Sequence, residues 1–345
     1  MSELVGAVLT RPSVDADRAA SILREQWGIE GVLRPLPSER DRNFAVAPDG
    51  VERFVLKISN ATEDPAVIAF QHEALARLDA VGVPCQLPVP TSEGDVLVAV
   101  DPGSGGGGAP LLVRLMTWLP GQPLATLPPA ERSPALLRDL GWVMGRAARA
   151  FEGWDHPAAH RDFQWEAGRG LRVIEAHGAA VTDPGRAALL GAWRRRLARL
   201  AAVLPALRHG VIHNDANDHN VLVDPEAGRV TGLLDLGDSV WSVVASELAV
   251  AAAYAALDTE DPLAVIATIR DGFEAALPLT DEERAVIVEL VALRLATSVA
   301  LSAHQSRLDP GDPYLTVSEA PAWQLLERLS AVDPADAAAR IAEAS

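Results

Sequence analysis

The hydrophobic and polar positions of this chain repeat with two different periods, and the change between them comes near residue 120. In the first part, short apolar runs bounded by turn residues predict strands at residues 31–37, 44–48 and 53–58. Asp49–Gly50, between the last two runs, is typical of a hairpin turn. We therefore expect a three-stranded antiparallel meander.

Two helices and two further strands complete the predicted first part. Apolar residues recur at helical spacing from Ser13, a candidate N-cap, to Gly28, and again over residues 65–81. Apolar runs at residues 96–100 and 111–119 predict two more strands. The glycine-rich run that separates them lacks the Lys-Ser/Thr ending of a P-loop, so we interpret it as a hairpin loop.

Beyond Pro120 the chain becomes rich in alanine and leucine, with apolar residues recurring every three to four positions. This period predicts helices at residues 134–152, 168–177, 184–206, 243–257, 262–276, 281–301 and 319–329, and in the amphipathic tail from Asp333. The sequence therefore predicts the α+β class, with a small antiparallel sheet followed by a mainly helical part.

One segment, residues 211–239, departs from the helical period. Val211 and Ile212 lead into a polar loop, and the apolar run after that loop is followed by a turn and a second apolar run that ends at Asp235. The loop contains Asp215 and Asn220. Both polar clusters therefore fall at the ends of short buried strands.

Polar groups in this arrangement suit phosphoryl transfer, in which a protein mainly positions groups and neutralises charge. Asp215 can accept the proton of a substrate hydroxyl, while Asn220 and Asp235 offer the hard oxygen ligands that Mg²⁺ prefers. The order His-x-Asp-x-x-x-x-Asn, followed by an Asp after the next strand, is that of kinase catalytic loops and metal sites. The alternative is a pair of hydrophobic strands that carry solvated acids at their ends.

The segments HNDANDHNVLV and GLLDLGDS resemble those of the aminoglycoside phosphotransferase and choline kinase family, which has a two-lobed protein-kinase-like fold. NDANDHNVLV, GLLDLGD, VASELAVAAAYA and the Trp165 region are most similar to the hydroxylysine kinase branch. The resemblance implies a nucleotide-binding lobe at residues 1–119 and a catalytic and substrate-binding lobe at residues 120–345. It also implies that His213 holds the catalytic loop by hydrogen bonds. Asn214 stands where many members have glycine.

The resemblance further implies a site for ATP or GTP in the first lobe. Lys57 would bind the phosphates and Glu73, in the following helix, would orient it; alternatively, Lys57 is an edge lysine with its ammonium in water. No glycine motif lies between the first two strands, so phosphate contacts fall to Ser38, Arg42 and Asn43. Contacts to the base fall to residues 116–119, which include Met116 and Trp118, with ordinary core packing as the alternative.

Composition narrows the range of partners. A net charge of −17 argues against nucleic acid or an anionic membrane as the main partner and permits a cationic substrate, although acidity can also serve solubility alone. The longest uninterrupted apolar stretch, residues 248–257, is too short to span a bilayer. A single cysteine, Cys85, and no secretory signal pattern indicate the cytoplasm. A monomer and a homodimer both remain open.

These observations lead to a functional hypothesis: a Mg²⁺-dependent kinase that phosphorylates a hydroxyl of a small amine-containing alcohol such as 5-hydroxylysine. No Ala-Pro-Glu segment follows Asp235, which disfavours protein substrates. If two of the acidic residues Asp218, Asp238 and Glu247 face the cleft, they form a negative substrate pocket, with Trp165 as an aromatic wall. The alternative is that these acids face solvent or cap helices. The alternatives are an antibiotic O-phosphotransferase and a catalytically silent nucleotide-binding scaffold.

Overall fold

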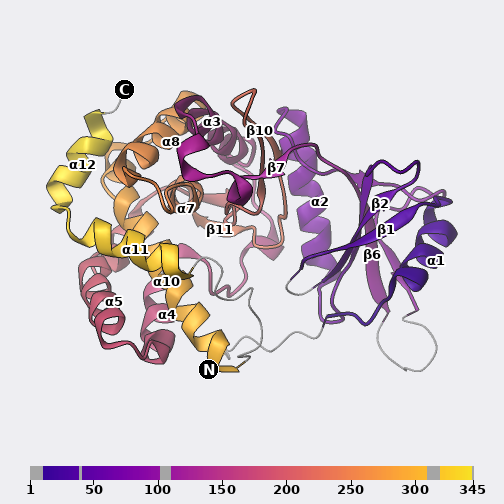
Figure 1. The fold of residues 1–345 in the computed structure, drawn as a ribbon, viewed down its shortest axis with the longest axis horizontal. Helices are drawn as coiled ribbons and strands as arrows, with labels where there is room; N and C mark the ends of the chain where they lie inside the picture. The colour runs from indigo at the N-terminus through magenta and orange to yellow at the C-terminus, as the bar shows by residue number, and fades with distance from the viewer. Residues whose placement is uncertain (1–10, 39–40, 102–109, 309–318, 344–345) are drawn as a thin grey trace. The chain divides into compact units, whose positions relative to one another are not determined.

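The computed structural model describes residues 11–38, 41–101, 110–308 and 319–343 (Figure 1). The chain folds into two compact units. Unit 1 consists of Met1–Asp79 with Pro84–Pro120, and unit 2 of Ala80–Val83 with Gly121–Ser345. The glycine-rich run at residues 102–108 and residues 309–318 lie outside the described residues.

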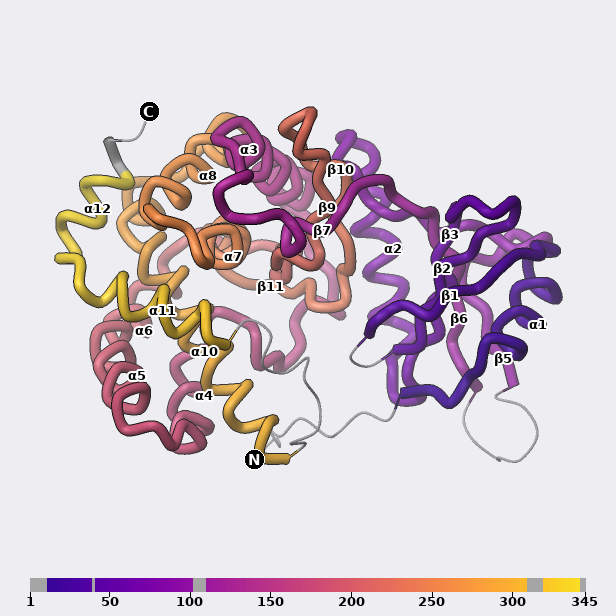
Figure 2. Tube along the Cα trace, in the orientation of Figure 1, coloured from indigo at the N-terminus to yellow at the C-terminus, as the bar shows by residue number. Residues whose placement is uncertain are grey.

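Unit 1 is built on an antiparallel sheet with strand order β1-β2-β3-β6-β4, in which β5 also pairs with β6. The strands are β1 (Val32–Leu36), β2 (Arg42–Ala47), β3 (Phe54–Ile58), β4 (Pro88–Val89), β5 (Val98–Val100) and β6 (Leu111–Thr117). The helices α1 (Ala16–Trp27) and α2 (Pro65–Ala80) lie on opposite faces of this sheet (Figure 2). The predicted meander is thereby confirmed.

The core of unit 1 lies between α1 and the sheet. Ile22, Leu23 and Trp27 of α1 belong to one buried cluster with Phe44 and Leu56 of the strands. These apolar positions explain why the amphipathic helix docks on this face. The helix is capped by Asp15, whose side chain accepts a hydrogen bond from Arg18 N, so the prediction of Ser13 as the cap was wrong.

Unit 2 is mainly helical, as predicted. Its helices are α3 (Pro134–Ala150), α4 (Gly170–His177), α5 (Pro184–Leu197), α6 (Leu200–Val203), α7 (Ala245–Ala255), α8 (Pro262–Ala276), α9 (Asp281–Arg284), α10 (Ile287–Leu308), α11 (Glu319–Ser330) and α12 (Pro334–Glu343). Every residue of α7 is buried. α3 and α8 approach closely because Gly141 and Gly272 face the partner backbone: a Cβ on either would lie within 2 Å of a carbonyl oxygen of the other helix.

Two predicted helices of unit 2 are divided. The segment 184–206 breaks into α5, α6 and a 3₁₀ turn at Leu204–Ala206, where Pro205 has no N–H to continue a helical ladder. The segment 281–301 divides into α9 and α10. Among the described residues, α10 is long and apolar enough to cross a membrane, but 83% of its apolar stretch is buried inside the fold. It is therefore a core helix of unit 2.

Two short sheets frame the polar loops of unit 2. Strands β9 (Val221–Asp224) and β10 (Arg229–Leu233) pair as a hairpin with β7 (Gln122–Pro123) beside β9, whereas β8 (His209–Ile212) pairs with β11 (Val240–Val243). The prediction that a helix begins at residue 243 was wrong, because Val243 pairs with His209. The pairings hold residues 213–220 and 234–239 at the ends of both sheets.

Candidate functional site

The buried carboxylate of Glu247 holds the loop after β8 by hydrogen bonds to its backbone. Glu247 of α7 is 1% exposed, and its two oxygens accept the backbone N–H groups of His213 and Asn214, each at 3.0 Å. Asn214 has a φ of 65°, a left-handed conformation that asparagine tolerates better than most residues other than glycine. Asparagine can therefore occupy this position with less strain than most other residues would meet.

His213 fixes the loop from within. Its Nδ1 accepts the N–H of Asp215 at 3.2 Å, so Nε2 carries the proton and donates to the carbonyl of Leu234 at 2.9 Å. The side chain is fully buried, and burial lowers the pKa of His213 to about 4. Both ring nitrogens of His213 are thus engaged in hydrogen bonds that hold this loop.

Asp215 is the most heavily engaged carboxylate of the loop. Its Oδ1 accepts from Arg294 Nη2 at 2.8 Å, and its Oδ2 accepts from Asn217 Nδ2 at 3.0 Å and Asn220 Nδ2 at 2.7 Å. The side chain keeps 18% of its surface exposed. Burial, and secondarily the charge of Asp238, raise the pKa of Asp215 above its ordinary range, against the opposing charge of Arg294. A carboxylate held in one rotamer with a raised pKa suits a general base.

One backbone hydrogen bond joins Asn220 to the residue before Asp235. The N–H of Leu234 donates to the carbonyl of Asn220 at 2.8 Å, so the residue that ends the first loop lies beside the residue that follows β10. Asn220 directs its Nδ2 to Asp215, and among the described residues its Oδ1 accepts no hydrogen bond. Asp235 takes a left-handed φ of 56°, and its Oδ1 accepts from Gly237 N at 2.9 Å.

This pair of oxygen groups fits a hard divalent cation. One carboxylate and one amide oxygen leave most coordination positions to water and phosphate, as Mg²⁺ prefers. Within the described ranges, no cluster of three or more His, Cys, Asp or Glu side chains offers an all-protein metal site. Arg161 supports the Asp235 loop by donating to the carbonyls of Gly237 and Ser239.

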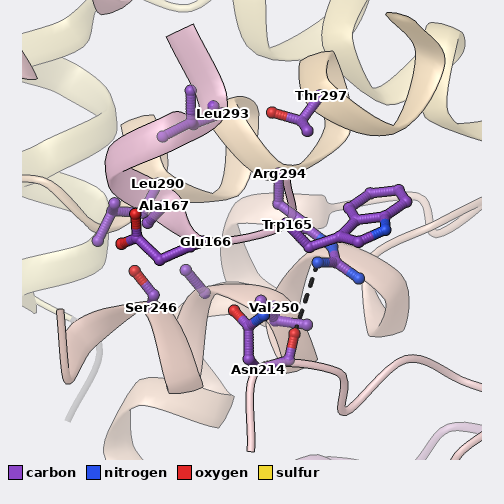
Figure 3. A pocket seen from close by; sticks show the side chains of 12 residues that line it. Trp165, Glu166, Ala167, Asn214, Ser246, Val250, Leu290, Leu293, Arg294 and Thr297 are labelled. Atoms are coloured by element: carbon purple, nitrogen blue, oxygen red, sulfur yellow. Dashed lines mark hydrogen bonds between the residues drawn. The ribbon is translucent and has the colours of Figure 1, made fainter. Parts of the chain in front are cut away.

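The predicted substrate residues take different positions. Trp165 stacks on the guanidinium of Arg294: the Arg294 Cζ atom lies 4.3 Å from the centroid of the Trp165 ring (Figure 3). Asp238 influences the pKa of Asp215. Asp218 is 8% exposed, and its Oδ1 is buried without a hydrogen-bond partner in the described part of the chain. The expectation that Glu247 contacts a substrate is not met, because both its oxygens bind the backbone inside the fold.

In unit 1, Lys57 lies in a row of polar residues across the sheet. Asn43, Lys57 and Arg114 are direct cross-strand partners on β2, β3 and β6, so their side chains share one face. Lys57 is 9% exposed. Burial and, secondarily, the charge of Arg114 lower the pKa of His72 on α2 to about 4, so this face is the one that α2 covers. Glu73 is the next residue of α2 and is exposed.

The other predicted nucleotide residues of unit 1 are less well placed. Arg42 lies one position before Asn43, so strand alternation turns it to the α1 face, where its Nε donates to the carbonyl of Val14. The prediction of Arg42 as a phosphate contact is therefore not met. Ser38 Oγ accepts from the N–H of Asp41, the residue before β2, at 3.2 Å.

Residues 116–119, predicted to contact the base, lie at the end of β6 and just beyond it. The side chain of Met116 is 3% exposed and packs in the sheet interior. The N–H of Trp118 donates to the carbonyl of Arg53 at 2.8 Å. The N–H of Trp118 is thus engaged within unit 1, while its ring is partly exposed.

Sequence reasoning missed one site residue and undervalued another. Arg294 lies within the apolar run of α10, whose hydrophobic period predicts a core helix. No local motif around Arg294 indicates that it contacts Asp215. For Lys57, the composition of the chain is a stronger indication of a functional role than its position on a strand. It is the only lysine of the sequence, in which every other residue of the 30 Lys and Arg is arginine.

Comparisons with known proteins identify the family of this chain. Residues 32–286 match the family described as "Phosphotransferase enzyme family". Hydroxylysine kinase of Danio rerio is 28% identical over 331 residues, covering 93% of this chain and 92% of that protein. Hydroxylysine kinase of Bos taurus is 29% identical over 343 residues, covering 93% and 90%.

Solved structures share the fold at lower identity. Amicoumacin kinase hAmiN, in complex with AMP-PNP, Ca²⁺ and Ami, has a TM-score of 0.69 at 15% identity and covers 94% of this chain and 97% of that chain. A microcompartment-associated aminopropanol kinase also has a TM-score of 0.69, at 20% identity, covering 95% and 100%. The predicted kinase-like α+β fold is therefore confirmed. Because the family match extends over well more than half of its residues, this chain belongs to the phosphotransferase enzyme family.

Proposed function

We propose that this protein is a Mg²⁺-dependent kinase that transfers the γ-phosphate of ATP or GTP to a hydroxyl of a small amine-containing substrate, with 5-hydroxylysine or a related hydroxy amino acid as the acceptor. The observation that carries the proposal is the environment of Asp215. Three side chains fix this carboxylate, its pKa is raised, and Asn220 joins it directly to the loop of Asp235.

Each residue has a distinct role in this proposal. Asp215 accepts the proton of the acceptor hydroxyl as that oxygen attacks phosphorus. Asn220 Oδ1 and the Asp235 carboxylate hold the metal ion, which neutralises phosphate charge when it is bound. Lys57 contributes a compact ammonium charge to the phosphates from the α2 face of the sheet in unit 1.

The acceptor class rests on two supports. The relatives that align over more than nine tenths of this chain carry the name hydroxylysine kinase. The structural neighbours that act on antibiotics are 20% identical or less and speak for the fold alone. The residues around Asp215 add a local excess of negative charge, since Asp238 acts on it. An ammonium group near the reacting hydroxyl suits that charge.

The setting of the enzyme is proposed on simpler grounds. Cys85 is a buried free thiol, and burial raises its pKa to about 12, so it has little reactivity as a thiolate. A chain with one such cysteine needs no oxidising compartment, and we place it in the cytoplasm as a monomer or homodimer.

A transfer screen tests the function. Purified protein with Mg²⁺ and either ATP or GTP is offered hydroxy amino acids, amino alcohols and aminoglycosides, and phosphorylated products are detected by ³¹P NMR. We expect phosphorylation of 5-hydroxylysine or a close analogue, and loss of that product in Asp215→Ala. Transfer to none of the acceptors, or an equal rate in the variant, would reject the proposal.

A further inference from the structure

Arg294 has more hydrogen-bonding capacity than the described part of the fold uses. A guanidinium carries five N–H donors. Among the described residues, only Nη2 makes a short bond, to Asp215 at 2.8 Å; Nε lies 3.4 Å from Tyr254 Oη and Nη1 lies 3.5 Å from the carbonyl of Asn214. Both longer contacts exceed the ordinary range for N–H···O bonds. The side chain is nevertheless only 6% exposed, so its remaining donors have little access to water.

The guanidinium is fixed by aromatic rings while these donors stay unused. Its carbon lies 4.3 Å from the ring centroid of Trp165 and 5.5 Å from that of Tyr254. Aromatic contacts of this kind orient a cation without consuming its N–H groups. Arg294 is thus held in one orientation next to the proposed base.

A crevice opens at this residue. Its lining includes Trp165, Glu166, Asn214 and Ser246 besides Arg294, and Figure 3 shows Glu166 and Arg294 on opposite sides of it. Glu166 Oε1 accepts from Ser242 Oγ and Gly168 N, and its Oε2 accepts no hydrogen bond among the described residues. The crevice therefore presents one under-used cation and one under-used carboxylate oxygen.

We infer that this crevice is a subsite for the amino acid end of the acceptor, with Arg294 binding its α-carboxylate. An α-amino acid carries one carboxylate and one ammonium group, which match Arg294 and Glu166 in sign. A planar guanidinium can bind two carboxylates along different edges, so Asp215 and the substrate share it. The inference rests on the proposed function, because it names the acceptor recognised next to Asp215.

A purely structural role makes a different prediction. If Arg294 only orients Asp215, its loss slows transfer to every acceptor alike and changes kcat. If Arg294 binds the carboxylate, its loss raises KM for the acceptor that carries the carboxylate and leaves KM for the acceptor without it unchanged. The enzyme then no longer discriminates between the two acceptors. The ratio of kcat/KM for two acceptors separates the two roles, whatever happens to the absolute rate.

The test begins with the unaltered protein and two acceptors, 5-hydroxylysine and 5-hydroxylysinamide. They differ only in the carboxylate. We expect kcat/KM to favour the carboxylate by about tenfold to a hundredfold, as for one hydrogen-bonded charged group. Equal kcat/KM values would overturn the inference and leave the proposed function intact.

Variants assign the preference to its residue. In Arg294→Gln the ratio should fall close to one, and Arg294→Lys should keep part of it because the charge remains. The matched control is Arg199→Gln. Arg199 is bound to Glu289, which lies on α10, the helix that carries Arg294. It should leave the ratio unchanged. A full preference retained in Arg294→Gln would reject the assignment.

A binding measurement covers the case in which neither acceptor is phosphorylated. That result rejects the proposed function, and calorimetry then compares L-lysine with L-lysinamide, which need no transfer. Tighter binding of L-lysine, lost in Arg294→Gln, supports the subsite. Equal binding, or none, overturns it.

Discussion

Arg294 Nη2 and Asp215 Oδ1 form a 2.8 Å ion pair in which the two side chains are 6% and 18% exposed. A pair this enclosed gains little net stability from its own attraction, since both charges have lost water. Removing one partner is costly, however, because the other stays buried without a counter-charge. The pair therefore ties the geometry of the proposed base to helix α10.

Replacing Asp215 by asparagine should separate catalysis from nucleotide binding. The amide keeps the size of the side chain and cannot accept the hydroxyl proton, so kcat should fall by about two to four orders of magnitude. Mg-nucleotide affinity, measured by calorimetry, should change little. The free energy of unfolding should also decrease by about 3–5 kcal/mol, because Arg294 loses its directly bonded carboxylate. A kcat near that of the unaltered protein contradicts the role of Asp215.

Asp235→Asn should weaken metal-dependent nucleotide binding while preserving the loop. Asparagine tolerates the left-handed φ of 56° and can still accept from Gly237 N, so the backbone is undisturbed. The lost negative charge removes the stronger of the two proposed metal ligands. Calorimetry with and without Mg²⁺ should show that the metal no longer increases affinity. An unchanged Mg²⁺ effect would exclude Asp235 as a ligand.

Lys57→Arg tests the only lysine of the chain against the residue used at all its other cationic positions. The larger guanidinium must fit beside Arg114, its cross-strand partner, and its charge is spread over a plane. We expect kcat/KM for the nucleotide to drop by about tenfold to a hundredfold, as for one charged hydrogen bond. Arg53→Lys, on an exposed side chain of the same unit, is the control and should have no effect.

Local patterns were sufficient to predict the strands around residues 211–239 and the oxygen groups at their ends. Asn220 is joined by one backbone hydrogen bond to Leu234, the residue before Asp235, an arrangement that the order of elements already implies. The face of Arg42 was not predicted, although strand alternation from Lys57 determines it. That error came from treating residues 38–43 as a loop when the strand already begins at Arg42.

Contacts across long sequence separations could not be predicted in the same way. Arg294 reaches Asp215 from a helix 79 positions away, and Glu247 reaches the loop from α7. Both are charged residues within apolar helices, where a polar group must find a partner. Their sequence context marks them as buried and gives no partner. Strand β11 was missed because the helical apolar period begins directly after it.

His213 and Glu247, which hold the loop after β8, should change the free energy of unfolding with pH in opposite directions. The folded pKa of His213 is lowered to about 4, so the unfolded chain binds its proton first and stability falls as pH drops from about 6.5 to 4. Burial raises the folded pKa of Glu247 to about 7, so stability from this group is present at low pH and is lost as pH rises from about 4.5 to 7. Between about 4.5 and 6.5 the two slopes oppose each other.

Glu247→Gln should expose the slope due to His213. Only one side-chain oxygen remains for the two backbone N–H groups, so the free energy of unfolding should decrease by about 1–3 kcal/mol near neutral pH. Urea unfolding between pH 4.5 and 6.5 should then show stability falling with acidification by up to about 1.4 kcal/mol per pH unit more steeply than before. Parallel pH curves for the two proteins would contradict the opposing shifts.

An acceptor with an ammonium group beside its hydroxyl should be phosphorylated faster than its deaminated analogue. Asp238 and Asp215 place two carboxylates against one guanidinium, which leaves an excess of negative charge where the hydroxyl must approach. The matched pair is 5-hydroxylysine and 2-amino-5-hydroxyhexanoic acid, which share the α-amino acid end and differ in the side-chain amine. We expect kcat/KM to favour 5-hydroxylysine and the preference to shrink in Asp238→Asn. Equal values for the two compounds would show that the acceptor site does not select an ammonium group, and would point to a neutral hydroxy amino acid as the substrate.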